Sequence, residues 1–146
     1  MKVYLDTSVI AALVLQQSSA PAQRRWVNEN ATELLISSFG WGEFVDAVAR
    51  NVRQHVLTIG EGAEIVDNVA FSPHGWVRLE TCDADVLDAA SFITADMARG
   101  LKLGDAIHLA ICRRLGATLL TGDRRQAAAA TAFGIPSHLI LPEPEA

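Results

Sequence analysis

Short apolar runs alternate along the chain with longer segments whose apolar residues recur at helical spacing. The runs are short and continuously apolar, as expected of strands buried on both faces, and they lie at residues 2–5, 34–37, 76–79, 118–121 and 138–141. The helical segments between them cover residues 8–16, 21–30, 40–55, 60–69, 83–100, 104–116 and 124–133. This alternation predicts a parallel sheet of five strands with helices on both faces.

Capping residues indicate where several of these helices begin and end. Ser8 and Asp83 are predicted N-caps, and Gly100, Gly116 and Gly134 are predicted to end the helices before them. The helix that follows Asp83 presents four apolar residues on one face, namely Val86, Leu87, Ala90 and Ile93. That face is the one predicted to pack against the core.

Acidic residues stand where predicted strands end. Asp6 directly follows the first strand, and Asp123 follows the fourth after a single glycine. Asp105 lies in the first turn of its helix, and Glu43 lies in the first turn of the helix after the second strand. Ligands of parallel sheets bind beyond the carboxyl ends of the strands. The four carboxylates are therefore predicted to converge on one small volume.

Each carboxylate also has a purely structural interpretation. Asp105 is a favourable charge at a helix N-terminus, worth about 0.3–1 kcal/mol, and Asp123 is an N-cap of the next helix. Glu43 is a solvated residue of a surface helix. Asp6 is the hardest to explain in this way, because the end of a buried strand is an unfavourable place for a lone charge. Together the four favour a shared site, since one bound cation accounts for all of them.

A divalent cation would make such a cluster tolerable. Carboxylates that converge without compensation repel one another, and their pKa values rise. Mg²⁺ prefers oxygen ligands and keeps bound waters, one of which can attack a phosphodiester bond. Hydroxyls beside the acids are suited to hold a metal-bound water or a phosphate; they belong to Thr7, Ser8 and Thr121. Arg124 and Arg125 either contact phosphate or form solvated helix surface.

Composition narrows the class of protein. The chain has 146 residues, 50% of them hydrophobic, which fits one domain over residues 1–141 and a short tail at 142–146. Its formal net charge of −5 argues against a protein that coats nucleic acid or a membrane, but not against a nuclease with acidic ligands. Two cysteines do not make a disulfide framework, and neither a secretory pattern nor an apolar run of about 20 residues is present. We expect a cytoplasmic protein.

Four segments carry the acidic residues: "YLDTSVI" around Asp6, "GWGEFVDAVAR" around Glu43, "LKLGDAIHLAIC" around Asp105 and "LLTGDRR" around Asp123. In these segments, and in their order, the chain resembles the PIN-domain ribonucleases and among them the VapC-type toxins of bacterial toxin–antitoxin pairs. The resemblance covers essentially the whole chain. It implies a PIN-like α/β/α sandwich of three layers around the five-stranded parallel sheet.

The resemblance also implies an activity and its residues. It implies an endoribonuclease, dependent on Mg²⁺ or Mn²⁺, that cleaves RNA at the carboxylates Asp6, Glu43, Asp105 and Asp123. Asp6 and Asp105 are the first candidates for metal ligands, followed by Asp123, while Glu43 and Asp123 hold waters or a second ion. The implied partners are the RNA substrate, a small VapB-like antitoxin and a second copy of the chain.

Other side chains near these motifs are assigned less directly. His108, three residues after Asp105, lies on the same helix face, and we favour a structural role for it over a catalytic one. We assign Phe44 to the core. Trp26 and Trp41 belong either to the core or to an apolar groove that, by the resemblance, receives the antitoxin.

Three other functions compete with the nuclease. A PIN-like scaffold that binds RNA or a partner without cutting is disfavoured by the intact set of acids. A phospho-accepting domain of the flavodoxin-like class needs a lysine after a late strand, but the only lysines are Lys2 and Lys102. A phosphatase resembling the haloacid dehalogenases needs a D-x-D motif, and the position of its second acid holds Ser8.

Overall fold

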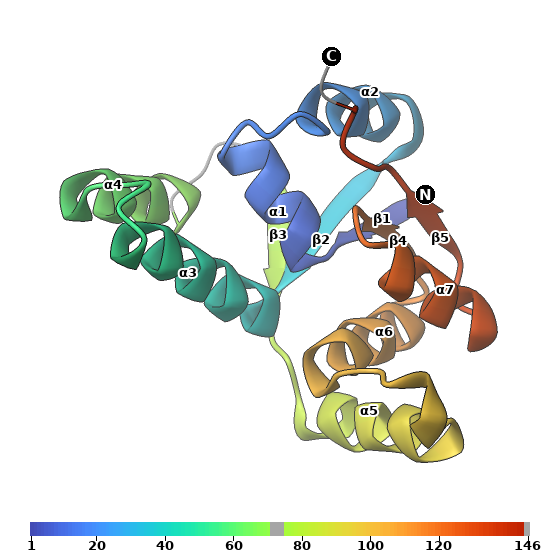
Figure 1. The fold of residues 1–146 in the computed structure, drawn as a ribbon. Helices are drawn as coiled ribbons and strands as arrows, with labels where there is room; N and C mark the ends of the chain where they lie inside the picture. The colour runs from blue at the N-terminus through green and yellow to red at the C-terminus, as the bar shows by residue number, and fades with distance from the viewer. Residues whose placement is uncertain (71–74, 145–146) are drawn as a thin grey trace.

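The computed structural model, drawn in Figure 1, describes residues 1–70 and 75–144, so the end of the predicted tail, residues 145–146, lies outside the described residues. Its elements are, in chain order, β1 (Lys2–Leu5), α1 (Thr7–Val14), α2 (Ala20–Asn30), β2 (Glu33–Ser37), α3 (Ser38–Arg53), α4 (Ile59–Ala70), β3 (Trp76–Leu79), α5 (Asp83–Ala95), the 3₁₀ helix η1 (Met97–Arg99), α6 (Leu103–Leu115), β4 (Thr118–Thr121), α7 (Arg124–Ala132) and β5 (Ser137–Leu139).

The strands form one parallel sheet of five strands in the order β3-β2-β1-β4-β5. β1 is central, and its Tyr4 pairs with Leu35 of β2 on one side and with Leu119 of β4 on the other. In Figure 1 the helices α1 to α4 and the helices α5 to α7 form two separate groups around this sheet. The predicted α/β/α sandwich is confirmed.

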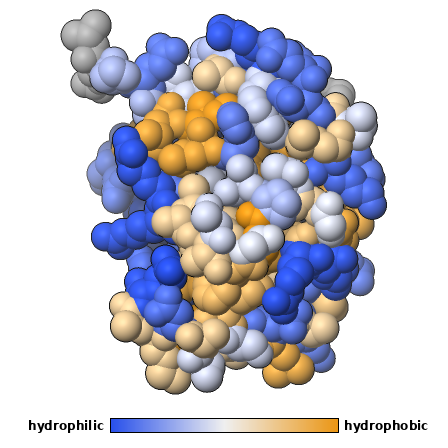
Figure 2. Space-filling model, turned by 90° about the vertical axis from the view of Figure 1, so that its right-hand side faces the viewer, coloured by the Kyte–Doolittle hydropathy of each residue, from blue (hydrophilic) through white to orange (hydrophobic). Residues whose placement is uncertain are grey.

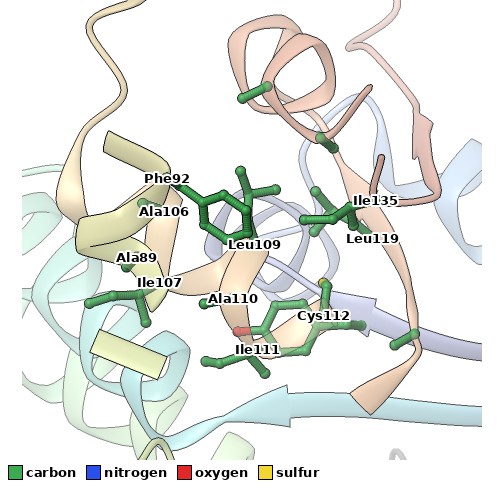
Figure 3. Packing of buried hydrophobic residues seen from close by; sticks show 14 of the residues in the cluster. Ala89, Phe92, Ala106, Ile107, Leu109, Ala110, Ile111, Cys112, Leu119 and Ile135 are labelled. Atoms are coloured by element: carbon green, nitrogen blue, oxygen red, sulfur yellow. The ribbon is translucent and has the colours of Figure 1, made fainter. Parts of the chain in front are cut away.

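Two hydrophobic clusters, one on each face, hold the helices to the sheet. Tyr4, Leu35 and Leu119 belong to a cluster with residues of α5, α6 and α7, part of which is shown in Figure 3. The neighbouring strand residues Val3 and Leu5 belong instead to a cluster with residues of α1, α3 and α4. Because side chains alternate between the two faces of a strand, the strands β1 to β4 each contribute to both clusters. This is why the strands are continuously apolar in sequence.

The face of α5 that packs against the core is not the predicted one. Val86, Leu87 and Ala90 are exposed and only Ile93 packs, partly buried, against the core, whereas Ala89 and Phe92 are buried. An ion pair accompanies the buried face: the buried Asp85 accepts hydrogen bonds of 2.8 and 2.9 Å from the exposed Arg114 guanidinium of α6. Asp85, Ala89 and Phe92 share a helix face, so this pair turns that face toward α6.

Several helix ends also differ by a few residues from prediction. α1 is capped by Asp6, not Ser8, because Asp6 is extended and accepts from the backbone N–H of Val9. α5 begins at Asp83, which makes Cys82 the N-cap. This helix ends at Ala95 and is followed by η1, after which Gly100 takes a φ of 74°. That left-handed conformation explains the glycine there.

Three aromatic residues, Phe44, Trp41 and Trp26, lie in or against the second cluster. Phe44 is fully buried, as predicted. Trp41 is partly buried beside Phe44, with ring centroids 6.0 Å apart. Trp26 is also partly buried and stacks on His138 at 4.6 Å. Both tryptophans therefore border the core, and a partner-binding role for them stays a prediction.

Figure 2 shows the face that lies on the right-hand side of Figure 1, where α7 and β5 are found. Apolar residues, in orange and tan, run through the middle of this face between hydrophilic residues in blue. Within residues 1–70 and 75–144, no helix has the length and apolar character needed to cross a membrane.

Candidate functional site

Asp6 lies at the carboxyl end of β1 and is only 4% exposed. Its Oδ1 accepts hydrogen bonds from the Ser8 hydroxyl and from the backbone N–H of Val9. Burial raises the pKa of Asp6, although hydrogen bonds with Ser8 and Thr121 oppose this rise. The fold therefore compensates the charge of Asp6 only in part.

The hydroxyls of Ser8 and Thr121 connect Asp6 to the loop that carries Asp123. Ser8 Oγ accepts from the backbone N–H of Gly122 at 3.0 Å. Thr121 Oγ1 accepts from the backbone N–H of Asp123 at 3.0 Å. The ends of the adjacent strands β1 and β4 are thus joined by side chains predicted to belong to the site.

Asp123 is the N-cap of α7, as its structural interpretation predicted. Its Oδ1 accepts from the backbone N–H groups of Arg125 at 2.8 Å and Gln126 at 3.4 Å. The Gln126 side chain donates a hydrogen bond of 3.0 Å to the backbone carbonyl of Asp105. The beginnings of α6 and α7, which carry Asp105 and Asp123, are therefore held together.

Asp105 lies in the first turn of α6 and is half-buried. Its carboxylate has no hydrogen bond or ion pair with any described residue. Burial raises the pKa of Asp105, and the negative charges of Asp123, Glu43 and Asp6 raise it further, against a smaller opposing effect of His108. The charges of the three other predicted acids thus all act on Asp105 at this end of the sheet.

The pKa of Glu43, on α3, is shifted in the opposite direction to that of Asp105. Its Oε1 accepts a hydrogen bond of 2.6 Å from the Thr7 hydroxyl and lies 2.6 Å from Nε2 of His108. Burial alone would raise the pKa of Glu43, but the hydrogen bonds from His108 and Thr7 outweigh it, and the pKa is lowered. Glu43 is therefore held as a carboxylate.

A cavity of about 460 Å³ opens beside two of the acids. Asp105 and Asp123 line it together with three cationic side chains, those of Arg99, Lys102 and Arg125. Such a mixture of carboxylates and cations suits a ligand that carries phosphates and binds through a metal ion.

The four carboxylates are coupled by charge but do not form one ligand cluster. Asp6 and Glu43 are not among the residues that line the cavity. In the part of the chain that the structure describes, no three Asp, Glu, His or Cys side chains are grouped so as to hold a metal ion. The structure brings Asp105 and Asp123 to one cavity, whereas hydroxyl, backbone and imidazole donors surround Asp6 and Glu43. A joint role of all four at one metal site therefore stays a prediction.

The sequence profile of the PIN domain matches residues 3–132, which span all four acids. The chain belongs to the PIN domain family. Among curated protein sequences there is no significant match.

Solved structures similar to this PIN domain include toxins and toxin–antitoxin complexes. The Mycobacterium tuberculosis toxin VapC20, named as cleaving the sarcin–ricin loop, matches with a TM-score of 0.69 and 18% identity over 87% of this chain and 94% of that chain. The DNA-bound VapBC2 of Rickettsia felis matches with a TM-score of 0.70 and 13% identity over 96% and 99% of the two chains. DNA-bound VapBC of Salmonella typhimurium matches with a TM-score of 0.70 and 14% identity over 94% of this chain and 97% of that chain. At this identity the likeness establishes a shared fold.

Of the two arginines predicted either to contact phosphate or to form solvated surface, Arg125 lines the cavity and Arg124 does not. Lys102 and Arg99, which were not predicted, also line it, and their signal in the sequence was their place shortly before Asp105. His108 contacts Glu43, 65 residues away in sequence, and not Asp105.

Proposed function

We propose that this PIN domain is a divalent-metal-dependent endoribonuclease that acts as the toxin of a VapBC-type pair. The observation that carries the proposal is the cavity in which Asp105 and Asp123 face Lys102 and Arg125. Membership of the PIN domain family and the likeness to VapC toxins support it.

The acidic residues fit Mg²⁺ or Mn²⁺ by the chemistry of their oxygens. The Asp105 carboxylate has no donor of its own, and its pKa is raised by burial and by its acidic neighbours, so a cation beside it would relieve repulsion. Mg²⁺ is commonly held by one or two carboxylates, with waters and substrate phosphates as its other ligands. Asp105 and Asp123 would hold the ion, and Asp6, which the sequence also predicts as a ligand, adds negative charge beside them. Once bound, the ion makes a water more acidic and neutralises charge at the phosphodiester.

The protein's own residues carry the remaining work. Glu43, whose lowered pKa keeps it ionised, accepts the proton of the attacking water. Lys102 and Arg125 bind phosphates of the RNA backbone, because charge-assisted hydrogen bonds to phosphate are strong. Thr7 and Ser8 orient Glu43 and Asp6 through the hydrogen bonds described above.

RNA cleavage by purified protein tests the activity. With Mg²⁺, Asp105→Asn should lower cleavage by more than about 100-fold, since even the outer-shell partners of a bound metal are worth 10–100-fold. The matched control is Asp46→Asn, which removes an exposed carboxylate of α3 that pairs only with Arg50. Sequencing of the RNA ends identifies the cut bonds. Full cleavage by Asp105→Asn would refute the assignment, and RNA binding without cleavage by the wild type would establish the scaffold function instead.

Growth of a bacterial culture tests the toxin role separately. Expression of the chain alone should arrest growth, and Asp6→Asn should not, because asparagine keeps the N-cap of α1 but removes the charge. Equal growth of both cultures would remove the toxin role and leave the nuclease assignment standing.

The antitoxin would dock in an apolar groove between α3 and α4. This groove has a volume of about 490 Å³ and is lined mainly by Val45, Val48, Val52, Ile59 and Val66. An amphipathic helix with apolar residues at helical spacing is the kind of segment that fills such a groove. The likeness to solved VapBC complexes supports an antitoxin as the partner.

A further inference from the structure

A chain of hydrogen bonds runs from the centre of the sheet to Glu43. Tyr4 Oη lies 2.7 Å from Ser37 Oγ and 2.6 Å from Nδ1 of His108. Nε2 of the same ring lies 2.6 Å from Glu43 Oε1, which also accepts from Thr7 Oγ1 at 2.6 Å. Tyr4, Ser37 and His108 are at most 2% exposed. Glu43 is the end of this series of hydrogen bonds that reaches the site.

Counting donors and acceptors places the protons. A carboxylate can only accept, so the proton between Glu43 and His108 belongs to Nε2. Ser37 Oγ accepts from the backbone N–H of Gly40 at 2.9 Å and contacts Tyr4 Oη, which in turn contacts Nδ1 of the imidazole. The proton on Nε2 is therefore the one that the geometry assigns.

Close packing surrounds both the His108 imidazole and the Glu43 carboxylate. A Cβ at Gly40 would lie 3.3 Å from Cε1 of His108, and a Cβ at Gly104 would lie 3.0 Å from Oε2 of Glu43. The Phe39 ring packs edge-on against the imidazole at 5.3 Å. Two glycines in the first turns of α3 and α6 thus leave the space that the imidazole and the carboxylate occupy.

We propose that His108, which donates from Nε2 to Glu43, is a positioning residue that holds the Glu43 carboxylate in its working orientation. His108 does not line the cavity and acts through Glu43. The hydrogen bond is a property of the folded chain, whereas its effect on cleavage rests on the proposed function. Partners of this kind orient site carboxylates in many enzymes.

Nitrogen NMR of the wild-type chain tests this hydrogen bond without any assay of activity. Nε2 of the His108 ring should carry a proton, because the carboxylate that it faces can only accept. An Nε2 that carries no proton in the wild type would overturn the proposal.

Two matched glycine variants test the effect on cleavage. Gly104→Ala crowds the Glu43 carboxylate without removing a hydrogen-bonding group, whereas a Cβ at Gly42 meets nothing within 4 Å. Gly104→Ala should lower kcat by about tenfold and leave KM unchanged, as expected when an outer contact of a site residue is disturbed. Gly42→Ala should cleave like the wild type. Equal kcat values in the two variants would overturn the positioning role.

A double-mutant cycle separates positioning from packing. His108→Gln should lower cleavage in the wild type but have no further effect in the Glu43→Gln background, because both changes remove the same interaction. An equal loss in both backgrounds would mean that His108 acts through packing alone. If the wild type cleaves no RNA, the proposed function fails and the positioning role fails with it, while NMR still decides whether Nε2 of His108 donates to Glu43.

Discussion

The carboxylates at the carboxyl ends of the strands differ in what surrounds them. Glu43 receives hydrogen bonds from an imidazole and a hydroxyl, and its pKa is lowered against the effect of burial. Asp105 has no such donor, and its pKa is raised by burial and by acidic neighbours. Titratable groups whose surroundings move their pKa values in opposite directions are a feature of sites that handle protons and charge.

This difference predicts how Asp105→Asn changes stability with pH. The pKa of Asp105 in the folded protein lies above its ordinary value of 3.8, so the wild type loses stability as pH rises from that value through the folded pKa. Asparagine does not ionise. The metal-free variant should therefore match the wild type near pH 3.8 and exceed it at pH 7, by no more than about 1 kcal/mol because the group is partly solvated.

Urea unfolding of both proteins across this pH range measures the effect. Contributions of Asp6 and Glu43 are present in both chains and largely cancel in the difference. A difference in unfolding free energy that stays constant with pH would contradict the charge coupling of Asp105.

The junctions between strands and helices combine two roles in one residue. Asp6 and Asp123 each follow a strand, and each caps the helix that comes next. A cap accepts backbone N–H groups at the positive end of the helix dipole, so it places a carboxylate at the sheet edge at little energetic cost. The structural interpretation of Asp123 and its place in the cavity lining therefore do not exclude each other.

Two substitutions of Asp123 separate the cap from the site. Asparagine is as good an N-cap as aspartate, whereas alanine is not, so only Asp123→Ala should lower the free energy of unfolding, by about 1 kcal/mol. Both variants should lose RNA cleavage, because both lack the charge. Denaturant unfolding and a cleavage assay on the same samples measure the two effects. Wild-type cleavage by Asp123→Asn would show that the site does not need this charge.

At the scale of the whole molecule, the strand order decides which chain segments meet. β1 lies between β2 and β4, so the segments that follow these three strands meet at one edge. Those segments carry Asp6, Glu43 and Asp123, and the first turn of α6 adds Asp105. The repulsion among them is a property of the assembled sheet, since they are far apart in the unfolded chain.

A divalent ion should therefore stabilise the folded protein. An ion that binds only the folded form at about 100 times its Kd adds about 2.7 kcal/mol, which corresponds to a rise in Tm of about 5 °C or more. Thermal unfolding with Mg²⁺ or Mn²⁺ measures it, with NaCl at equal ionic strength as the control for screening. Asp105→Asn should reduce the rise and Asp46→Asn should not. An unchanged Tm in saturating metal would refute the metal site.

The sequence by itself determined the elements and their order. Strands appear as short apolar runs, helices show apolar residues at helical spacing, and helices end at glycines such as Gly116. Each of these features depends on neighbours within a few residues, so the sequence shows them directly. Asp6 and Asp123 were placed at the sheet edge by the same local pattern and by the rule for parallel sheets. The predicted caps Ser8 and Asp83 lie two residues and one residue after the observed caps, Asp6 and Cys82.

Only the tertiary structure decided which groups face each other. The bond between Tyr4 and His108 joins residues 104 apart in sequence, and that between His108 and Glu43 joins residues 65 apart. The buried face of α5 was set by Asp85 and Arg114 on different helices. Such contacts depend on register and on the rotation of packed helices, which no local pattern specifies, so partners of the acids emerge only when the chain is folded.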